Sequence, residues 1–368
     1  MLFRLTAGTN VGCVRTNNED NFIVNDNLDN KDWFLPSDVS KAIPLGKSGA
    51  ILVVADGMGG MNAGEVASAI AIDTVKSIFS LDDFTKVTAS ERKIEAFLKD
   101  AIVEADNKIK AKVKEDESTS GMGTTIVIAW VLDNMVHIAW CGDSRAYVFN
   151  TASGLVRLSK DHSYVQELVD AGKLDPELAF DHPNSNIITR SLGDSPVKAR
   201  PDYVSRILSS GDVVLLCSDG LCGLCRDEEI VQVMAAAKDI YSCKNNLINE
   251  ALRAGGYDNV TVALLEVESV EENEDEKVSV DTTNDMNKVK SRRRKSRTLT
   301  MLVFLLLLAG VGAWLYLSGN WRPALKFVKD KLEVCLDESE QSDDQTAVLG
   351  ENIDESLEQT PVDTINIQ

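Results

Sequence analysis

Residues 124–141 read Thr-Thr-Ile-Val-Ile-Ala-Trp-Val-Leu-Asp-Asn-Met-Val-His-Ile-Ala-Trp-Cys. Two runs rich in β-branched and aromatic residues, 124–132 and 135–141, are separated only by Asp133-Asn134. Residues of this kind favour strands, and a two-residue link with Asp or Asn is typical of a tight hairpin. The stretch therefore predicts two antiparallel strands that lie side by side.

Similar patterns continue on both sides of this hairpin. Short apolar runs predict further strands at 50–56, 145–149, 213–218 and 260–267. Helices are predicted at 63–79, 91–114, 163–171, 227–237 and 243–253. Hairpin-linked strands with helices outside them indicate an α+β domain with an antiparallel sheet core, which we place at residues 1–268.

Residues 173–200 differ from the rest of this domain. They contain Pro176, Pro183 and Pro196 and show little periodicity. We expect a structured loop or flap, because long loops inside a compact domain are often functional.

Five short acidic motifs are spread over the same domain. They contain Glu19-Asp20, Asp56-Gly57, Gly142-Asp143, Asp219-Gly220 and Asp258-Asn259. Three of the motifs come directly after an apolar run, so their carboxylates are expected at the ends of buried strands. Several such strand ends that converge would form a pocket of carboxylate oxygens, which is the kind of site that Mg²⁺ and Mn²⁺ prefer.

Composition narrows the class of protein. The chain of 368 residues is 44% hydrophobic and 26% charged, which suits a globular core. Its net charge of −20 argues against nucleic acid or an anionic membrane surface as the main ligand. The seven cysteines show no framework spacing, which indicates a reducing compartment.

A site with two such cations suits phosphate chemistry. Two hard cations about 3.5–4 Å apart lower the pKa of a shared water, which can then attack phosphorus in line with the leaving oxygen. An arginine binds two phosphate oxygens at once with its planar fork. Arg15 stands just before Glu19 and Asp20, so a phosphate clamp is expected beside the metal ligands.

These motifs together resemble the metal-dependent serine/threonine protein phosphatases of the type 2C (PPM) family, and most of all their bacterial members. The similarity covers about residues 5–268. The matching strings are Gly12-Cys-Val-Arg15-Thr-Asn-Asn-Glu19-Asp20, Val54-Ala-Asp56-Gly57-Met58-Gly59-Gly60, Gly121-Met122-Gly123-Thr124-Thr125, Gly142-Asp143-Ser144-Arg145, Ser218-Asp219-Gly220 and Asp258-Asn259.

The resemblance implies a fold, an activity and a metal site. The fold would be a central antiparallel β-sandwich flanked by helices in α-β-β-α layers, and the activity would be hydrolysis of phosphoserine and phosphothreonine in proteins. The cofactors would be two Mn²⁺ or Mg²⁺ ions. Asp56 would bridge them, the Gly57 carbonyl would bind the first ion, Glu19 would bind the second, and Asp219 and Asp258 would complete the pair.

Other residues receive roles from the same resemblance. Asp143 would bind a third, weaker ion, Arg15 would bind the substrate phosphate, and Asp20 would orient waters or Arg15. One departure concerns the general acid. Eukaryotic members often carry a histidine after Asp-Gly, whereas this chain has Met58. The acid that protonates the leaving oxygen is therefore left open, with water as the first choice.

The C-terminal part predicts a membrane anchor. Residues 269–297 form a linker that is first acidic and then basic, ending in Ser291-Arg292-Arg293-Arg294-Lys295-Ser296-Arg297. Residues 298–321 contain no charged side chain and are long enough to cross a bilayer as a helix. Because basic flanks stay in the cytoplasm, we expect a single-pass membrane protein with a cytoplasmic catalytic domain and an acidic extracytoplasmic tail at 322–368.

The leading hypothesis is thus a membrane-anchored phosphatase that acts on cytoplasmic phosphoproteins and opposes Ser/Thr protein kinases. Two alternatives differ in class or substrate. One is a phosphatase-like binding module that has lost catalysis, and the other is a regulator in a partner-switching pathway. The complete set of carboxylates argues against the binding module.

Overall fold

The computed structural model describes residues 1–30, 33, 41–59, 63–80, 84–193 and 197–270. A compact unit spans Met1–Asn273, close to the predicted domain of residues 1–268. Nearly all of the predicted linker at 269–297, the predicted transmembrane helix at 298–321 and the tail at 322–368 lie outside the described residues. Within the described part of the chain, no helix has both the length and the apolar composition needed to cross a bilayer.

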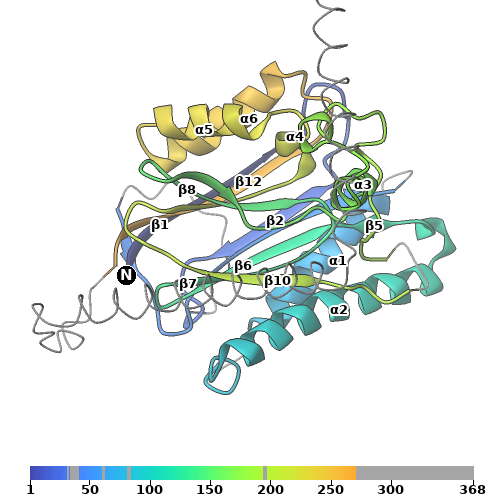
Figure 1. The fold of residues 1–368 in the computed structure, drawn as a ribbon. Coiled ribbons are helices and arrows are strands. Elements are labelled where there is room, and N and C mark those ends of the chain that lie inside the picture. Colours follow the sequence, from blue (N-terminus) through green and yellow to red (C-terminus); the bar gives the residue numbers. More distant parts are fainter. Residues whose placement is uncertain (31–32, 34–40, 60–62, 81–83, 194–196, 271–368) are drawn as a thin grey trace, which may run out of the picture. The chain divides into compact units, whose positions relative to one another are not determined.

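Two antiparallel sheets form the centre of the domain (Figure 1). The first sheet has the order β3-β1-β12-β11-β8-β9. Its strands are β1 (Leu2–Asn10), β3 (Ile43–Pro44), β8 (Arg145–Asn150), β9 (Gly154–Arg157), β11 (Val213–Cys217) and β12 (Val260–Ser269). The second has the order β10-β7-β6-β4-β2, and a short strand β5 also pairs with β4. Its strands are β2 (Asp20–Asn25), β4 (Ala50–Met58), β5 (Gly123–Thr124), β6 (Ile126–Leu132), β7 (Met135–Cys141) and β10 (Asp202–Ile207).

Helices cover the outer face of each sheet (Figure 1). Helices α1 (Ala63–Ile78) and α2 (Glu91–Glu115) pack on the second sheet, and α4 (Asp219–Cys222), α5 (Asp227–Ala236) and α6 (Ile240–Arg253) lie on the first. Helix α3 (Tyr164–Asp170) follows β9. The predicted α-β-β-α layering of an α+β domain is confirmed.

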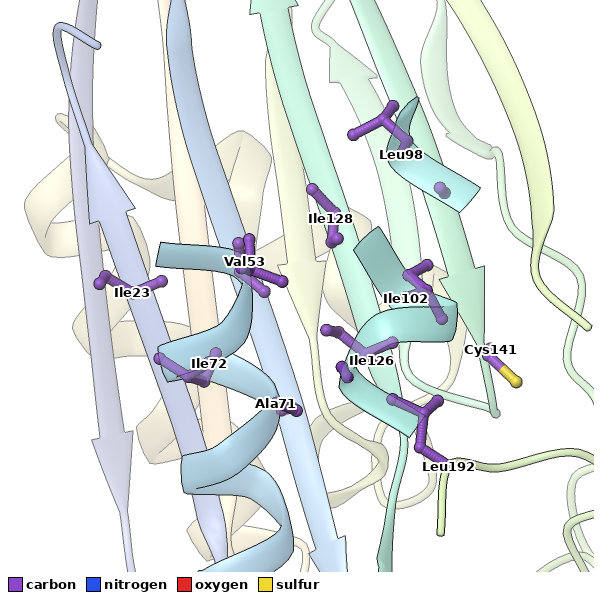
Figure 2. Packing of buried hydrophobic residues seen from close by; sticks show 14 of the residues in the cluster. Ile23, Val53, Ala71, Ile72, Leu98, Ile102, Ile126, Ile128, Cys141 and Leu192 are labelled. Carbon is purple, nitrogen blue, oxygen red and sulfur yellow. The ribbon is translucent and has the colours of Figure 1, made fainter. Parts of the chain in front are cut away.

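Three apolar clusters hold these layers together. Between the sheets, Val54 and Val127 of one sheet and Val214 and Leu265 of the other belong to one fully buried cluster. A second cluster fills the space under α1 and α2, as Figure 2 shows. Its labelled members include Ala71 and Ile72 on α1, Leu98 and Ile102 on α2, and Val53, Ile126 and Ile128 on the strands beneath them. The third lies between the first sheet and α4 to α6. Because the central strands are buried on both faces, their sequences are mostly apolar runs.

The predicted hairpin around Asp133-Asn134 is present. Strands β6 and β7 pair with Leu132 opposite Met135, and Asp133 in the turn has a positive φ of 52°. The predicted strand at 124–132 is, however, divided at Thr125. The Thr125 amide donates to the Asp56 carbonyl, and Thr125 Oγ1 accepts from the Asp56 amide. The Thr125 hydroxyl thus takes the place of the Thr125 carbonyl, which accepts from Thr124 Oγ1 instead, and this interrupts the regular ladder between Gly123–Thr124 and β6.

The predicted flap lies between α3 and β10 and is attached at its C-terminal end. Leu192 and Thr124 exchange both backbone hydrogen bonds, and Leu192 is buried among the residues of Figure 2. The buried carboxylate of Asp106 on α2 accepts from the amides of Gly193 and Ala199, at 2.9 and 3.0 Å. These contacts fix the end of the flap against the second sheet, close to the strand that carries Asp56.

Candidate metal centre

The predicted acidic residues come together at one end of the two sheets. Asp20 begins β2 and lies directly opposite Asp56 of β4 in the antiparallel register. Asp143 lies in the link between β7 and β8, Asp219 is the first residue of α4 after β11, and Asp258 lies two residues before the start of β12. Both sheets therefore contribute carboxylates to one site.

Asp56 is the central carboxylate of the group. Its side chain is hydrogen-bonded to that of Asp219, and the charges of Asp219, Asp20 and Asp143 all act on it. Burial is the largest cause that raises the pKa of Asp56 well above its usual range, and these neighbouring charges raise it further. Burial and the neighbouring charges therefore disfavour ionisation of Asp56 and Asp219 at the same time, and a bound cation would offset that cost.

Asp20 is held by groups from the opposite sheet. Its side chain is 8% exposed and accepts a hydrogen bond of 2.7 Å from Ser218 Oγ. Ser218 Oγ in turn accepts from the Thr261 amide at 3.0 Å. Burial raises the pKa of Asp20 to about 7, although the hydrogen bonds from Thr261 and Ser218 act in the other direction. Asp20 thus joins β2 to the ends of β11 and β12.

Asp143 carries an oxygen without a partner. The residue is 7% exposed, and its Oδ1 is buried with no hydrogen bond from any described residue. Burial, followed by the charge of Asp219, raises the pKa of Asp143 well above its usual range. A buried oxygen of this kind normally has a partner, so it is the atom in this site that most clearly requires a cation or a water.

Glu19 and Gly57 lie where the first helix begins. The Gly57 amide donates to the Glu19 carbonyl at 3.2 Å, and Ser68 Oγ donates to the same carbonyl at 2.6 Å. A Cβ at Gly57 would stand 2.3 Å from the Gly64 carbonyl oxygen, so only glycine fits there. The side chain of Asn259 fixes the loop before Glu19, because it accepts from the Glu19 amide and donates to the Asn17 carbonyl.

Arg15 lies at the rim of the site. Its guanidinium is half exposed and donates to the Asp258 carboxylate at 2.7 Å. That hydrogen bond, the Asp258 charge and the charges of Glu19 and Asp219 raise the pKa of Arg15 further above its usual range. The positively charged guanidinium of Arg15 therefore lies beside the acidic cluster and is open to solvent, as binding of a substrate phosphate requires.

A pocket of about 830 Å³ opens beside the carboxylates. Asp143, Asp219 and Asp258 line one part of it, and flap residues between Pro176 and Asn186 line another. The predicted flap thus borders the predicted site. This pocket is large enough for several residues of a peptide.

The acidic cluster fits divalent cations. Among the described residues no three or more Asp, Glu, His or Cys side chains are already arranged around an ion position. The donor set consists of carboxylate oxygens and one glycine carbonyl, which hard cations prefer, and the Asp143 oxygen without a partner supplies a ligand atom.

In the described part of the chain, none of the three histidines is hydrogen-bonded to a carboxylate of this cluster. His137 is hydrogen-bonded to Tyr203, and His182 lies in the flap, where its Nδ1 accepts from the Asn184 amide. His162 is buried and contacts Gly142 rather than an acidic side chain of the cluster.

Sequence reasoning missed the polar residues that support the carboxylates. Ser218 contacts Asp20, Thr125 contacts Ser144 and the backbone of Asp56, and Asn259 contacts the backbone of Glu19. Each of them stands inside or beside one of the motifs, and that position was their only signal. The partners are as far as 240 residues apart, so only the fold identifies them.

Comparison with known proteins gives one consistent result. The family model described as "Protein phosphatase 2C" matches residues 7–260. A curated relative, "Serine/threonine phosphatase stp" of Listeria monocytogenes serovar 1/2a, is 34% identical over 258 residues, which is 70% of this chain and 93% of the relative.

Solved structures agree with this result. The serine/threonine phosphatase PstP/Ppp of Mycobacterium tuberculosis superimposes with a TM-score of 0.60 at 33% identity and covers 73% of this chain and 100% of its own. A structure of the catalytic domain of PstP in complex with two manganese ions gives a TM-score of 0.57 at 31% identity, covering 72% of this chain and 98% of that one.

Proposed function

The chain belongs to the protein phosphatase 2C family and is a serine/threonine protein phosphatase, and we propose that Asp56, Asp219, Asp258, Glu19 and the Gly57 carbonyl hold two divalent cations for its reaction. The observation that carries this proposal is the convergence of buried carboxylates: Asp20 lies opposite Asp56, Asp56 is hydrogen-bonded to Asp219, and Oδ1 of Asp143 is buried without a partner among the described residues. A group of carboxylate oxygens of this kind is what Mg²⁺ and Mn²⁺ prefer, and a bound cation would offset the negative charge that these side chains place close together.

When bound, the cations would supply the positive charge that activates a water for attack on phosphorus and offsets the charge of the phosphate. Asp56 lies between Asp219 and Asp20, which makes it the natural bridging carboxylate. Asp143, with its unpartnered oxygen, would hold a third and weaker ion. The manganese in the PstP structure supports the choice of metal, and Mg²⁺ has the same ligand preference.

Arg15 positions the phosphate in this proposal. Its guanidinium already lies beside Asp258 with half of its surface exposed, so it needs only a small movement to donate two hydrogen bonds to phosphate oxygens. The peptide on either side of the phosphorylated residue would lie in the 830 Å³ pocket under the flap. The substrates are therefore phosphoproteins, and Ser/Thr protein kinases are the opposing enzymes.

The test compares metals, peptides and variants. Phosphate release from a phosphothreonine peptide should require Mn²⁺ or Mg²⁺, should stop with a chelator, and should be much faster than release from a phosphotyrosine peptide. Asp56→Asn should remove the activity and weaken Mn²⁺ binding measured by calorimetry, while its circular dichroism spectrum stays that of the wild type. Wild-type turnover in Asp56→Asn would refute the bridging role, and activity in excess chelator would refute the metal mechanism.

We also propose that residues 298–321 anchor the enzyme in a membrane with the catalytic domain in the cytoplasm. The support is the sequence itself, an uncharged span with the basic residues 291–297 before it. Cys13 is exposed in the catalytic domain, and Cys335 lies in the acidic tail. A membrane-impermeant maleimide added to intact cells should label Cys335 and not Cys13, and Cys335→Ser should abolish the label. Labelling of Cys13 without lysis would contradict this orientation.

A further inference from the structure

His162 connects the turn that carries Asp143 to the base of the flap. Its side chain is 3% exposed, and its Nδ1 accepts a hydrogen bond from the Gly142 amide at 3.1 Å. The His162 amide donates to the Gly142 carbonyl at 3.0 Å. Both backbone groups of Gly142 are therefore bonded to one residue, directly before Asp143.

The tautomer of His162 follows from these partners. Because Nδ1 accepts from an amide, the ring proton is on Nε2, which lies 3.1 Å from Oδ2 of Asp202 and donates to it. Arg190 also lies 3.2 Å from Nε2. An arginine can only donate a hydrogen bond, and the protonated Nε2 cannot accept one, so Arg190 donates to Asp202 instead. The imidazole is thus oriented by a carboxylate on one side and by a backbone amide on the other.

The same histidine is bonded to the flap. Its carbonyl accepts from the Thr189 amide at 2.7 Å, and the next residue, Ser163, pairs with Ile188 in an isolated bridge. Arg190 adds its contact with Asp202, the partner of the His162 ring. The base of the flap therefore has a fixed position with respect to the His162 backbone.

The turn held by His162 has little freedom of its own. Gly142 has a φ of 125°, which favours glycine, and a Cβ there would lie 2.5 Å from the Thr125 Cβ. On the other side of Asp143, Ser144 Oγ is hydrogen-bonded to Thr125 Oγ1 at 2.6 Å. Asp143 thus stands between two fixed neighbours, and the contact on its Gly142 side is the His162 ring.

We propose that His162 is a positioning residue that holds the Gly142–Asp143 turn, and with it the Asp143 carboxylate, in place with respect to the base of the flap. The inference rests on the proposed function, because it assigns His162 to the weaker cation site of the same centre. The contact responsible is the hydrogen bond that Nδ1 of His162 accepts from the Gly142 amide. Groups that orient metal ligands in this indirect way typically change metal affinity by about 10- to 100-fold when they are removed.

Two substitutions of His162 separate the contacts of its ring. His162→Asn keeps an acceptor near the place of Nδ1, whereas His162→Gln keeps a donor near the place of Nε2 and loses the acceptor for Gly142. We would measure Mn²⁺ binding to the full-length protein by calorimetry, which needs no turnover, and then KM and kcat on a phosphothreonine peptide. For His162→Gln the weakest Mn²⁺ equilibrium should weaken about tenfold or more, the tighter ions should bind as in wild type, and His162→Asn should recover most of the loss.

Three results would overturn the inference: equal Mn²⁺ binding by both variants and wild type, a loss in His162→Asn as large as in His162→Gln, or equal weakening of all ions. If His162→Gln does not fold, Asp202→Ala replaces it, since it removes the half-exposed carboxylate that accepts from Nε2 and orients the ring from outside. The weakest ion should then weaken in the same direction, and no change would also refute the inference. Failure of the wild-type protein to bind Mn²⁺ at all would instead refute the proposed metal centre.

Discussion

Replacement of Asp20 by asparagine should remove a pH dependence of stability from the metal-free protein. Asp20 is buried against Ser218 and has a pKa of about 7, compared with an ordinary value of 3.8. The difference is about three pH units, and each unit corresponds to about 1.4 kcal/mol. The group therefore lowers the free energy of unfolding by on the order of 4 kcal/mol once the pH is above 7.

The sign follows from proton linkage. Below pH 3.8 the carboxyl is protonated in both states and has no effect on stability. Between 3.8 and about 7 the folded state holds the proton while the unfolded state has lost it, so the free energy of unfolding falls as the pH rises. Above pH 7 both states are ionised, and the dependence ends. Asp20→Asn has no such proton to lose, and its amide oxygen can still accept from Ser218.

The assay is thermal and urea unfolding at pH 5 and pH 8 in excess chelator. Relative to Asp20→Asn, the wild type should lose on the order of 3 kcal/mol between these values, because only the interval from pH 5 to about 7 contributes. This loss corresponds to roughly 6 °C in Tm for a domain of this size. Saturating Mn²⁺ should reverse most of the loss in the wild type at pH 8. Asp73→Asn, an exposed change on α1, is the matched control and should follow the wild type. A wild-type curve parallel to that of Asp20→Asn would show that the carboxylates are not gathered in a buried site.

Further changes test the rim, the flap and the glycine of the centre. Arg15→Ala should raise KM about tenfold or more, because a charged hydrogen bond to phosphate is lost, and an unchanged KM would exclude the clamp. Asp106→Ala removes the carboxylate that accepts from the Gly193 and Ala199 amides and should lower the free energy of unfolding in urea by about 3 kcal/mol. The flap should also be cleaved faster by proteases, and an unchanged cleavage rate would show that Asp106 does not hold the flap. Gly57→Ala should abolish Mn²⁺ binding in calorimetry, since its Cβ would meet the Gly64 carbonyl, and wild-type binding would contradict the geometry.

The central strands and the main helices could be predicted from sequence because the pattern of their apolar residues follows which side chains are buried. Strands β4, β6, β7, β11 and β12 are covered on both faces and show as mostly apolar runs, interrupted by His137 in β7 and by Thr261 and Glu266 in β12. Strands β2, β9 and β10 stand at sheet edges, are short and contain polar residues, so the same criterion missed them. Strand β1 was also missed: Phe3 and Leu5 are buried on either side of the half-buried Arg4, but the alternation ends at Thr6, which is buried as well.

The carboxylates of the site could be predicted, but their supporting contacts could not. An aspartate beside glycine at the end of an apolar run has a local signature that the sequence displays. The bond from Ser218 to Asp20 joins residues 198 positions apart, and its existence depends on how the two sheets face each other. The same holds for His162, which as a lone histidine is more often part of a core than of a functional site.

The carboxylates divide between the two sheets, with Asp20 and Asp56 on one and Asp219 and Asp258 on the other. Cations bound among them would cross-link the two sheets of the sandwich. Small sliding movements between the sheets would then change the spacing of the carboxylates. A substitution in the apolar cluster between the sheets, far from any metal ligand, would therefore change the metal affinity.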